Sequence, residues 1–263
     1  MTLQLRQIAL VARELEPVLD DLTAILGINR CFVDPGVGVF GLENTLMPVG
    51  KNFLEVVAPV RDGTAGGRYL DRRGGDGGYM VITQADSVAS QQQVRANALA
   101  NDVRVAHEVE RGDWHLIQLH PGDLQAAFFE IETDAHNDFL GHWHPVGGTG
   151  WESEVRQEVT VDFTGVELQC VDPVELAQLW GKVAGLPVTE AKVQEQLVPM
   201  IELNNATVRF VEIQDDRGAG LGGVDLIVAN RDPILREAKR RDCYRSDDRV
   251  DICGTRFYLS ESS

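Results

Sequence analysis

The sequence has few positive charges: 24 Lys and Arg residues stand against 41 Asp and Glu residues, which gives a net charge of −17. A surface this acidic repels phosphate backbones and anionic membranes, so we expect neither a nucleic acid nor a membrane as partner. No apolar run approaches the ~20 residues of a membrane-spanning helix. Residues 1–6 lack the basic and apolar regions of a secretory signal. Together these absences predict a cytoplasmic protein.

Cysteine is also scarce, and its spacing indicates no metal or disulfide framework. Cys31, Cys170, Cys243 and Cys253 form no CxxC pair and lie far apart in a long chain, so we interpret them as free thiols. The sequence contains no GxSxG, HExxH or Walker motif and no GxGxxG after a strand. The glycine-rich residues 74–78 precede a strand instead of following one, and we interpret them as a hinge. The common hydrolase, zinc-protease and nucleotide-binding signatures are therefore absent.

What the sequence does contain is a fourfold repeat. The chain has 263 residues, 43% of them hydrophobic and 25% charged, which is enough for one large folded domain or two small ones. A strand-like run at 7–11 leads through Glu16-Pro17 into apolar residues at helical spacing that end at Gly27. The same order recurs at 79–83, 165–169 and 223–228, each run followed by a helix start at Asp86-Ser87, Asp172-Pro173 or Asp232-Pro233.

Alternating strand patterns follow each helix and complete a β-α-β-β-β module. In the first copy they are expected at 38–41, 45–48 and 52–57, separated by Gly and Pro turn signals. The modules cover about 4–60, 76–133, 162–214 and 221–260. Two modules per domain is the natural division: we expect a first domain at 1–146, a linker at 147–160 that begins with Gly147-Gly148-Thr149-Gly150, and a second domain at 161–263.

Paired β-α-β-β-β modules of this size resemble the vicinal oxygen chelate superfamily, which includes glyoxalase I, methylmalonyl-CoA epimerase, extradiol dioxygenases and bleomycin-resistance proteins. The opening strand-helix phrase, 6–15 through Leu26-Gly27, is the most specific part, and the Phe-Leu-Glu and Phe-Phe-Glu runs at 53–55 and 128–130 support it. The resemblance covers nearly the whole chain. It implies an α+β fold in which four modules pair into two domains with cupped mixed sheets.

The resemblance also implies where a metal site would lie, because the family takes its ligands from the first and last strands of two modules. The corresponding first-strand positions are Gln7 and Met80, and the last-strand positions are Glu55 and Glu130. The metal ligands implied are Gln7, Glu55 and Glu130, three hard oxygen donors that suit a divalent ion such as Mn, Fe, Ni, Mg or Zn. Met80 stands where the family usually has His, and a thioether suits such ions poorly. A site without metal is therefore the alternative.

Histidines offer further candidates for chemistry. Along 114–120 the even-numbered residues share one strand face, so His120 is expected to face the same cup as Glu130. There it is a candidate general acid or base or a replacement ligand, and a hydrogen-bonded structural histidine is the alternative. His136, His142 and His144 are typical of a polar loop at the mouth of a pocket, although His-x-His is also compatible with zinc.

The second domain is expected to be degenerate. Gly165 and Gly223 occupy its first-strand positions, and Arg209 or Val211 and Arg256 or Tyr258 replace the last-strand carboxylates. No set of metal ligands remains there. We expect this half to close the core, to form the interface of a homodimer or to recognise an anion.

Two functional hypotheses follow. The first is a glyoxalase-like enzyme, a lyase or isomerase, that acts on a small oxygenated substrate with a carbonyl group; Glu130 and His120 are its catalytic residues. The second is a metal-free small-molecule binding protein of the bleomycin-resistance type, in which the carboxylates hold a cationic ligand. In both, the expected pocket residues are Met80, Phe53, Phe128 and Trp114. The warrant for the reaction type is family likeness, since one fold serves many functions.

Overall fold

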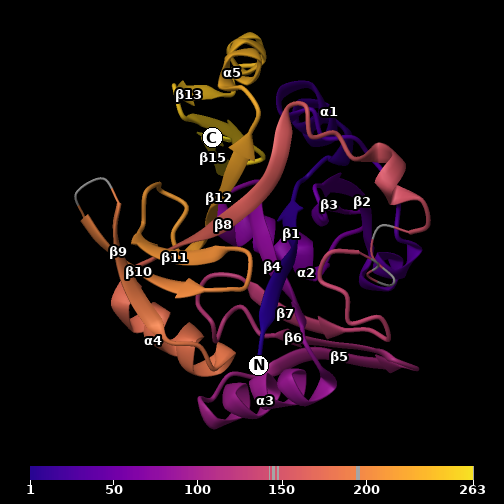
Figure 1. Ribbon diagram of the computed structural model, residues 1–263, viewed down its shortest axis with the longest axis vertical. Coiled ribbons are helices and arrows are strands. Elements are labelled where there is room, and N and C mark those ends of the chain that lie inside the picture. The colour runs from indigo at the N-terminus through magenta and orange to yellow at the C-terminus, as the bar shows by residue number, and fades with distance from the viewer. Residues whose placement is uncertain (142, 144–145, 147, 194–195, 263) are drawn as a thin grey trace. The chain divides into compact units, whose positions relative to one another are not determined.

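The computed structural model describes residues 1–141, 143, 146, 148–193 and 196–262 and shows four successive modules (Figure 1). The first contains β1 (Leu3–Val11), α1 (Leu15–Leu26), β2 (Leu42–Val49) and β3 (Asn52–Pro59). The second contains β4 (Gly77–Ala85), α3 (Val88–Ala100), β5 (Val105–Arg111), β6 (Trp114–Leu119) and β7 (Phe128–Thr133). The third contains β8 (Thr160–Cys170), α4 (Pro173–Ala184), β9 (Val188–Val193), β10 (Gln196–Glu202) and β11 (Thr207–Glu212). The fourth contains β12 (Gly220–Val228), α5 (Arg231–Arg240), β13 (Tyr244–Ser246), β14 (Arg249–Ile252) and β15 (Thr255–Glu261).

The strands form two mixed sheets. One has seven strands in the order β2-β3-β1-β4-β7-β6-β5, and the other has eight in the order β13-β14-β15-β12-β8-β11-β10-β9. In every module the first and last strands pair in parallel, as β1 with β3 and β4 with β7 illustrate. Each sheet thus contains strands of two modules, and the predicted α+β class with four paired modules is confirmed.

The helices begin and end where local sequence chemistry dictates. Asp172 caps α4 by accepting a 2.9 Å hydrogen bond from the Glu175 N–H, and Pro173 occupies the first turn, where its missing N–H costs nothing. Gly27 and Gly185 end α1 and α4 with positive φ angles of 67° and 66°, a left-handed conformation that favours glycine. No helix among the described residues is long and apolar enough to cross a membrane.

The structure differs from the local predictions at three places. The strand expected at 38–41 is a 3-10 helix, η1 (Pro35–Phe40), because Asp34 caps it by accepting a hydrogen bond from the Gly36 N–H. Before this helix, Phe32 forms an isolated antiparallel bridge with Leu46 of β2. The sequence reading also missed α2 (Ala65–Arg73), a polar helix that Thr64 caps and Gly74 ends. Of the glycines interpreted as a hinge, Gly77 and Gly78 belong to β4.

By its internal contacts the chain divides into two compact units. The first compact unit comprises Met1–Arg6, Tyr79–Trp143 and Gly165–Gly222, and the second comprises Gln7–Gly78, His144–Thr164 and Gly223–Ser263. The first has Trp180, Phe129 and Phe210 in its core, and the second has Phe53 against Trp151 of η2 (Trp151–Glu154). The domain boundaries at 146 and 161 remain a prediction, and position 147 of the expected linker lies outside the described residues.

Candidate functional site

A polar cluster in the second compact unit surrounds Glu55. Strand alternation places Phe53 and Glu55 on one face of β3, and the parallel register with β1 puts Gln7 and Ala9 on the same face. The Gln7 Nε2 atom donates to Glu55 Oε2 at 2.8 Å, and the Asn44 Nδ2 atom donates to Glu55 Oε1 at 2.5 Å. Gln7, Asn44 and Glu55 are 5%, 1% and 6% exposed. Each carboxylate oxygen of this buried glutamate therefore accepts a hydrogen bond from a side-chain amide.

A second cluster, in the first compact unit, surrounds Glu130. Glu130 and Glu132 lie two residues apart on the same face of β7, and both are buried. The Gln118 Nε2 atom donates to Glu130 Oε2 at 2.6 Å, and the indole Nε1 atom of Trp114 donates to Glu132 Oε2 at 3.1 Å. Burial, and then the neighbouring Glu132 carboxylate, raise the pKa of Glu130 well above its usual value, whereas the Gln118 bond acts in the opposite direction. Glu130 is therefore harder to ionise than an exposed glutamate.

This raised pKa predicts how stability depends on pH. The pKa of Glu130 is higher in the folded protein than in the unfolded chain. This difference therefore stabilises the folded protein fully at a pH below the unfolded-state pKa, and the stabilisation is lost as the pH rises through the folded-state pKa. Over that interval the free energy of unfolding should fall by about 1.4 kcal/mol per pH unit, and Glu130→Gln should abolish the fall. Urea unfolding at a series of pH values, with a chelator present to remove metal ions, measures this pH dependence of the free energy of unfolding. Glu132→Gln should reduce the fall, because it removes the charge next to Glu130. Equal pH dependence in all three proteins would contradict the assignment.

A buried arginine lies at the Glu132 end of this cluster. Gln84 stands opposite Glu132 in the pairing of β4 with β7, and the Arg6 Nη1 atom donates to Gln84 Oε1 at 2.6 Å. Arg6 also donates to the main-chain oxygens of Asp138 and Gly141 at 2.8 and 3.0 Å. Its guanidinium lies 4.9 Å from the ring centroid of the buried Trp143. Arg6 thereby ties β1 and β4 to the segment that follows β7.

The structure places the predicted pocket residues in different surroundings. Met80 is buried on β4 and stands opposite Phe128 on β7, whose ring lies 5.1 Å from that of Tyr79. Trp114 is half-buried and hydrogen-bonds Glu132, as described above. Phe53, in contrast, is 0% exposed, with its ring 5.0 Å from that of Trp151. It therefore presents no surface to a ligand in this conformation.

His120, the predicted acid or base, lies one residue beyond β6. Its Nδ1 atom accepts a 3.1 Å hydrogen bond from the Gly122 N–H and lies 3.8 Å from Asp123 Oδ1. Asp123 is itself held by Arg104, and this pairing lowers the pKa of Asp123 to about 2. His120 thus contacts Gly122 and Asp123 of its own turn, and Arg104. Glu130 finds its hydrogen-bonding partner on β6 itself, in Gln118.

The remaining predicted residues divide between a loop and the third module. The His136 N–H and the Asn137 N–H donate to Asp134 Oδ1, whereas His142 and His144 lie outside the described residues. In the third module Arg209 stands opposite Glu167 and donates to its Oε2 atom from Nε and Nη2, at 3.2 and 3.0 Å. Arg209 and Glu167 thus form a buried ion pair in the third module. Val211, two residues along the strand, lies on the same face as Arg209.

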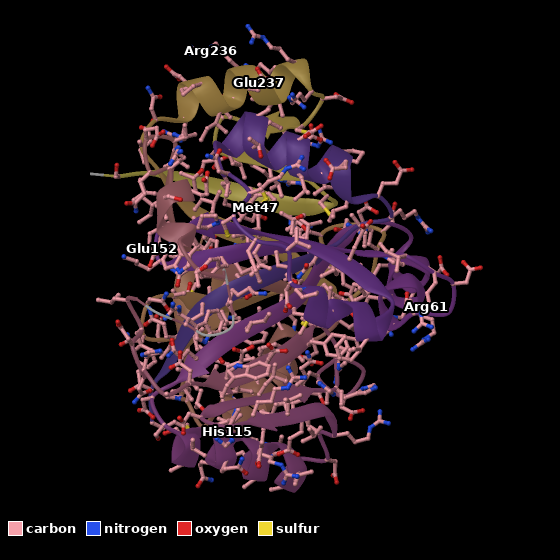
Figure 2. The ribbon with its side chains drawn as sticks, turned by 90° about the vertical axis from the view of Figure 1, so that its right-hand side faces the viewer. Met47, Arg61, His115, Glu152, Arg236 and Glu237 are labelled. Carbon is pink, nitrogen blue, oxygen red and sulfur yellow. The ribbon has the colours of Figure 1, made fainter. Side chains whose placement is uncertain are left out.

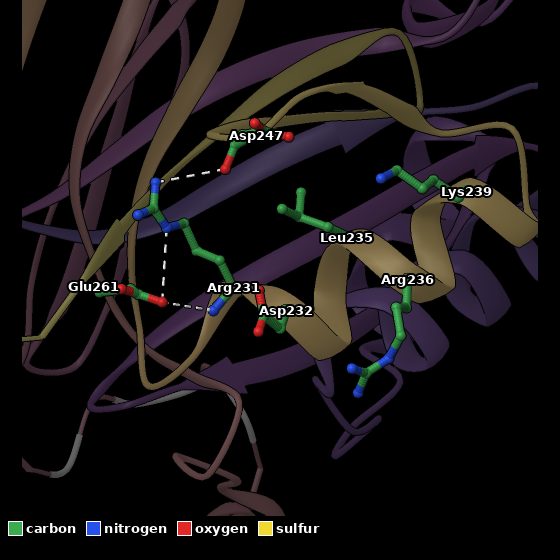
Figure 3. Close-up of a pocket in the computed structure, with 7 residues that line it drawn as sticks. All are labelled: Arg231, Asp232, Leu235, Arg236, Lys239, Asp247 and Glu261. Atoms are coloured by element: carbon green, nitrogen blue, oxygen red, sulfur yellow. Dashed lines mark hydrogen bonds and ion pairs between the residues drawn. The ribbon is translucent and has the colours of Figure 1, made fainter.

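Two cavities in the part of the chain that the structure describes are lined by none of the predicted site residues. The larger, about 580 Å³, lies along α5 and is lined by Arg231, Asp232, Leu235, Arg236, Lys239, Asp247 and Glu261 (Figure 3). Arg231 is paired with Glu261, and Arg236 projects from the exposed side of α5 (Figure 2). The lining of this larger cavity has three cationic and three anionic side chains, so its net charge favours neither anionic nor cationic ligands. The smaller, about 250 Å³, is lined by Gly50, Lys51, Glu152, Val155, Gln157 and Asp162.

Gln7 and Glu55 carry oxygen donors of the kind that a divalent cation prefers, but the geometry of the cluster does not present them to one. Gln7 Oε1 is buried and has no hydrogen-bond partner, whereas the Nε2 atom of the same amide faces the carboxylate, and both Glu55 oxygens are held by N–H donors. Among the described residues no group of three His, Cys, Asp or Glu side chains is arranged to hold a metal ion. The ligand set that the resemblance implies, Gln7, Glu55 and Glu130, therefore remains a prediction.

The sequence interpretation missed several members of these clusters. Asn44, Glu132, Arg6 and Gln84 received no role, although Glu132 repeats the polar alternation that singled out Glu130. Asn44, in contrast, stands between Glu43 and Thr45 and shows no such alternation. Alternation within a strand was thus an available signal for Glu132 and not for Asn44.

Comparison with known proteins places the fold. No model of a known protein family matches the sequence, and no curated protein matches it. A hypothetical protein from Staphylococcus aureus is 11% identical, with each chain covered completely and a TM-score of 0.63. A mutant of 4-hydroxymandelate synthase from Streptomyces coelicolor is 16% identical over 91% of this chain and 75% of that one, with a TM-score of 0.64.

A methylmalonyl-CoA epimerase variant from Streptomyces coelicolor, in complex with 2-nitronate-propionyl-CoA, is 20% identical over 50% of this chain and 97% of that one. The TM-score of this likeness is 0.43. The four modules, their two mixed sheets and the likeness to 4-hydroxymandelate synthase define an α+β fold of the vicinal oxygen chelate kind. At these identities the likeness establishes the fold alone.

Proposed function

We propose that this chain is an enzyme of the vicinal-oxygen-chelate type that acts on a small carbonyl-containing substrate, as a glyoxalase-like lyase or isomerase. One observation carries the proposal. The glutamates at corresponding last-strand positions, Glu55 and Glu130, are both buried, and each accepts a hydrogen bond from an amide on the preceding strand. Glutamates on strands commonly lie on a face that is exposed to solvent, but the burial of Glu55 and Glu130 excludes this explanation for them. Buried carboxyl groups held by specific donors are typical of acid–base sites.

Proton transfer is the chemistry that the Glu130 cluster supports. A neutral Glu130 donates its proton to a substrate atom, and the carboxylate left behind is stabilised by the amide of Gln118. Return of a proton from substrate to Glu130 completes an isomerisation. Met80, Phe128 and Trp114 would supply apolar walls that exclude water, and His120 remains a proposed acid or base at the end of β6.

As the alternative to proton donation by Glu130, we propose Gln7, Glu55 and Glu130 as the residues that would hold a divalent metal ion, the set that the family resemblance implies. Such an ion, when bound, polarises a carbonyl oxygen as a Lewis acid. Since only an ionised carboxylate is a good ligand, Glu130 must release its proton for metal to bind, and we expect tighter binding as the pH rises. Gln7 contributes its buried, unpartnered Oε1 atom.

Metal binding should be visible as stabilisation. Binding to the native state alone raises the free energy of unfolding by roughly 2.7 kcal/mol when the metal is at 100 times Kd. We expect one of Mg, Mn, Fe(II), Ni or Zn to stabilise the purified protein relative to a chelator and to be found near one ion per chain. A variant that combines Glu55→Ala and Glu130→Ala should lose both the stabilisation by metal and the bound metal ion. A protein that contains no metal and is stabilised by none would remove the metal from the proposal.

Met80 favours a second candidate function, a metal-free binding protein of the bleomycin-resistance type. Its neutral side chain is buried at the fourth ligand position, where it extends the apolar surface formed with Phe128. In such a protein the carboxylates would hold a cationic ligand, and the net charge of −17 would attract it.

A further inference from the structure

β9 is the last strand at one edge of the eight-stranded sheet (Figure 1). Its inner side pairs with β10 in antiparallel register, from Val188 opposite Ile201 to Val193 opposite Gln196. Among the described residues no strand pairs with its outer side. In an antiparallel pair, alternate residues direct their N–H and C=O groups away from the partner strand. The outer side of β9 therefore presents a row of main-chain donors and acceptors to a further strand.

The side chains of β9 leave this edge accessible. Residues 189–193 are all exposed, so both faces of the strand lie outside the core. Apolar surface is exposed there too: Val193 is 36% exposed, and Leu197, which stands opposite Lys192 on β10, is 69% exposed. A further strand can thus be added without displacing a buried side chain.

The sequence of β9 is complementary to itself in charge. Glu190 and Lys192 lie two residues apart and therefore on one face of the strand. When two copies of β9 pair antiparallel about a two-fold axis at Ala191, Glu190 of each copy stands opposite Lys192 of the other. The small Ala191 meets itself at the centre, and Thr189 meets Val193. Opposite charges and β-branched side chains that face each other directly both stabilise antiparallel pairs.

The same charges disfavour the neighbouring registers. A shift of two residues in one direction places Glu190 opposite Glu190, and a shift in the other direction places Lys192 opposite Lys192. A shift of one residue breaks the alternation of main-chain groups and turns the side chains of one copy to the other face. A lysine on an edge strand commonly prevents edge pairing. Here Glu190 on the same face offers that lysine a partner in a second copy of the chain.

We propose that the outer edge of β9 binds β9 of a second copy of this chain, antiparallel and centred on Ala191, so that two eight-stranded sheets join into one. Main-chain hydrogen bonds supply the affinity, and the two Glu190–Lys192 pairs set the register. The two-fold symmetry uses both edges completely, so assembly stops at a dimer. Since one short strand from each copy forms the contact, the dimer dissociates on dilution. This surface includes neither Glu55 nor Glu130 and is independent of the proposed function.

The test is sedimentation velocity of the full-length protein over a dilution series. We expect the wild-type mass to rise with concentration toward twice that of the chain. Glu190→Lys and Lys192→Glu should each weaken dimerisation by about tenfold or more, because like charges then face each other in both pairs. Glu202→Lys is the matched control: Glu202 is an exposed glutamate at the end of β10, away from the free edge, and its replacement changes the net charge equally. It should dimerise like the wild-type protein.

A mixture of the two variants tests the register itself. Equal amounts of Glu190→Lys and Lys192→Glu should associate with each other, because one copy then carries two lysines and the other two glutamates at the facing positions. The chain that combines both substitutions should dimerise like the wild-type protein. Urea unfolding confirms that each variant is folded.

Three results would overturn the proposal. The first is a wild-type protein that is monomeric at every concentration. The second is a dimer that both single variants leave unchanged, or that Glu202→Lys weakens equally, since another surface or the net charge would then control association. The third is a mixture of folded variants that fails to associate, because the facing of Glu190 and Lys192 would then be wrong.

Discussion

Replacement of Trp180 by alanine is expected to lower the free energy of unfolding by about 3–5 kcal/mol. Trp180 lies on α4 and is 1% exposed. Its ring lies 5.0 Å from Phe129 on β7 and 6.1 Å from Phe210 on β11, and its indole Nε1 atom donates to the Leu124 main-chain oxygen at 3.1 Å. Alanine leaves a large cavity there and removes one of the two hydrogen bonds that the Leu124 oxygen accepts, the other coming from the Ala126 N–H, and both changes cost free energy.

Urea unfolding followed by circular dichroism measures the loss. Val174→Ala is the matched control, since Val174 lies on the same helix and is 57% exposed; its effect should stay within about 0.5 kcal/mol. Trp180→Phe keeps an aromatic ring and should cost less than alanine. Losses of equal size in Trp180→Ala and Val174→Ala would show that Trp180 is not part of the core.

The largest functional effect is expected at Glu130. Glu130→Gln keeps the shape of the side chain and its contact with Gln118 but removes the transferable proton, so turnover should fall by about 10²–10⁴-fold. Glu130→Ala should lose as much. Steady-state assays with any substrate that the wild-type protein turns over give the ratio, and Glu43→Gln, an exposed glutamate on β2, is the control expected to retain activity. Turnover that survives in both Glu130 variants would assign the proton transfer to another group.

The modules were predictable because their signals are local. An apolar run, an acidic residue near a proline and a glycine stop define α1 and α4 without reference to the rest of the chain. The same locality explains the errors. The Asp34-Pro35 cap, which turns 35–40 into a 3-10 helix, competes with a strand pattern of only four residues. In α2 the buried residues include Tyr69 and Leu70, but the helix is mostly polar, so apolar spacing could not reveal it.

The sequence indicates which carboxylates stand in apolar strands but not which side chains contact them. Glu55 and Glu130 stand in such strands, where a carboxylate needs a specific partner, and both are buried. Which side chain supplies the partner depends on strand register, and register is a tertiary property. Asn44 reaches Glu55 because β2 pairs with β3, and Gln118 reaches Glu130 because β6 pairs with β7. The composition of the individual strands contains no such information.

The central claim, proton transfer next to a carbonyl group, is tested most directly by solvent exchange. The wild-type protein is incubated in D₂O with a panel of small carbonyl compounds, with and without Mn²⁺, and ¹H NMR follows the signal of each C–H beside the carbonyl. We predict that at least one compound incorporates deuterium with the wild-type protein and that Glu130→Ala abolishes the incorporation. If no compound exchanges, while apolar ligands bind the wild-type and Glu130→Ala proteins equally well, the chain is a binding protein and the enzymatic account is contradicted.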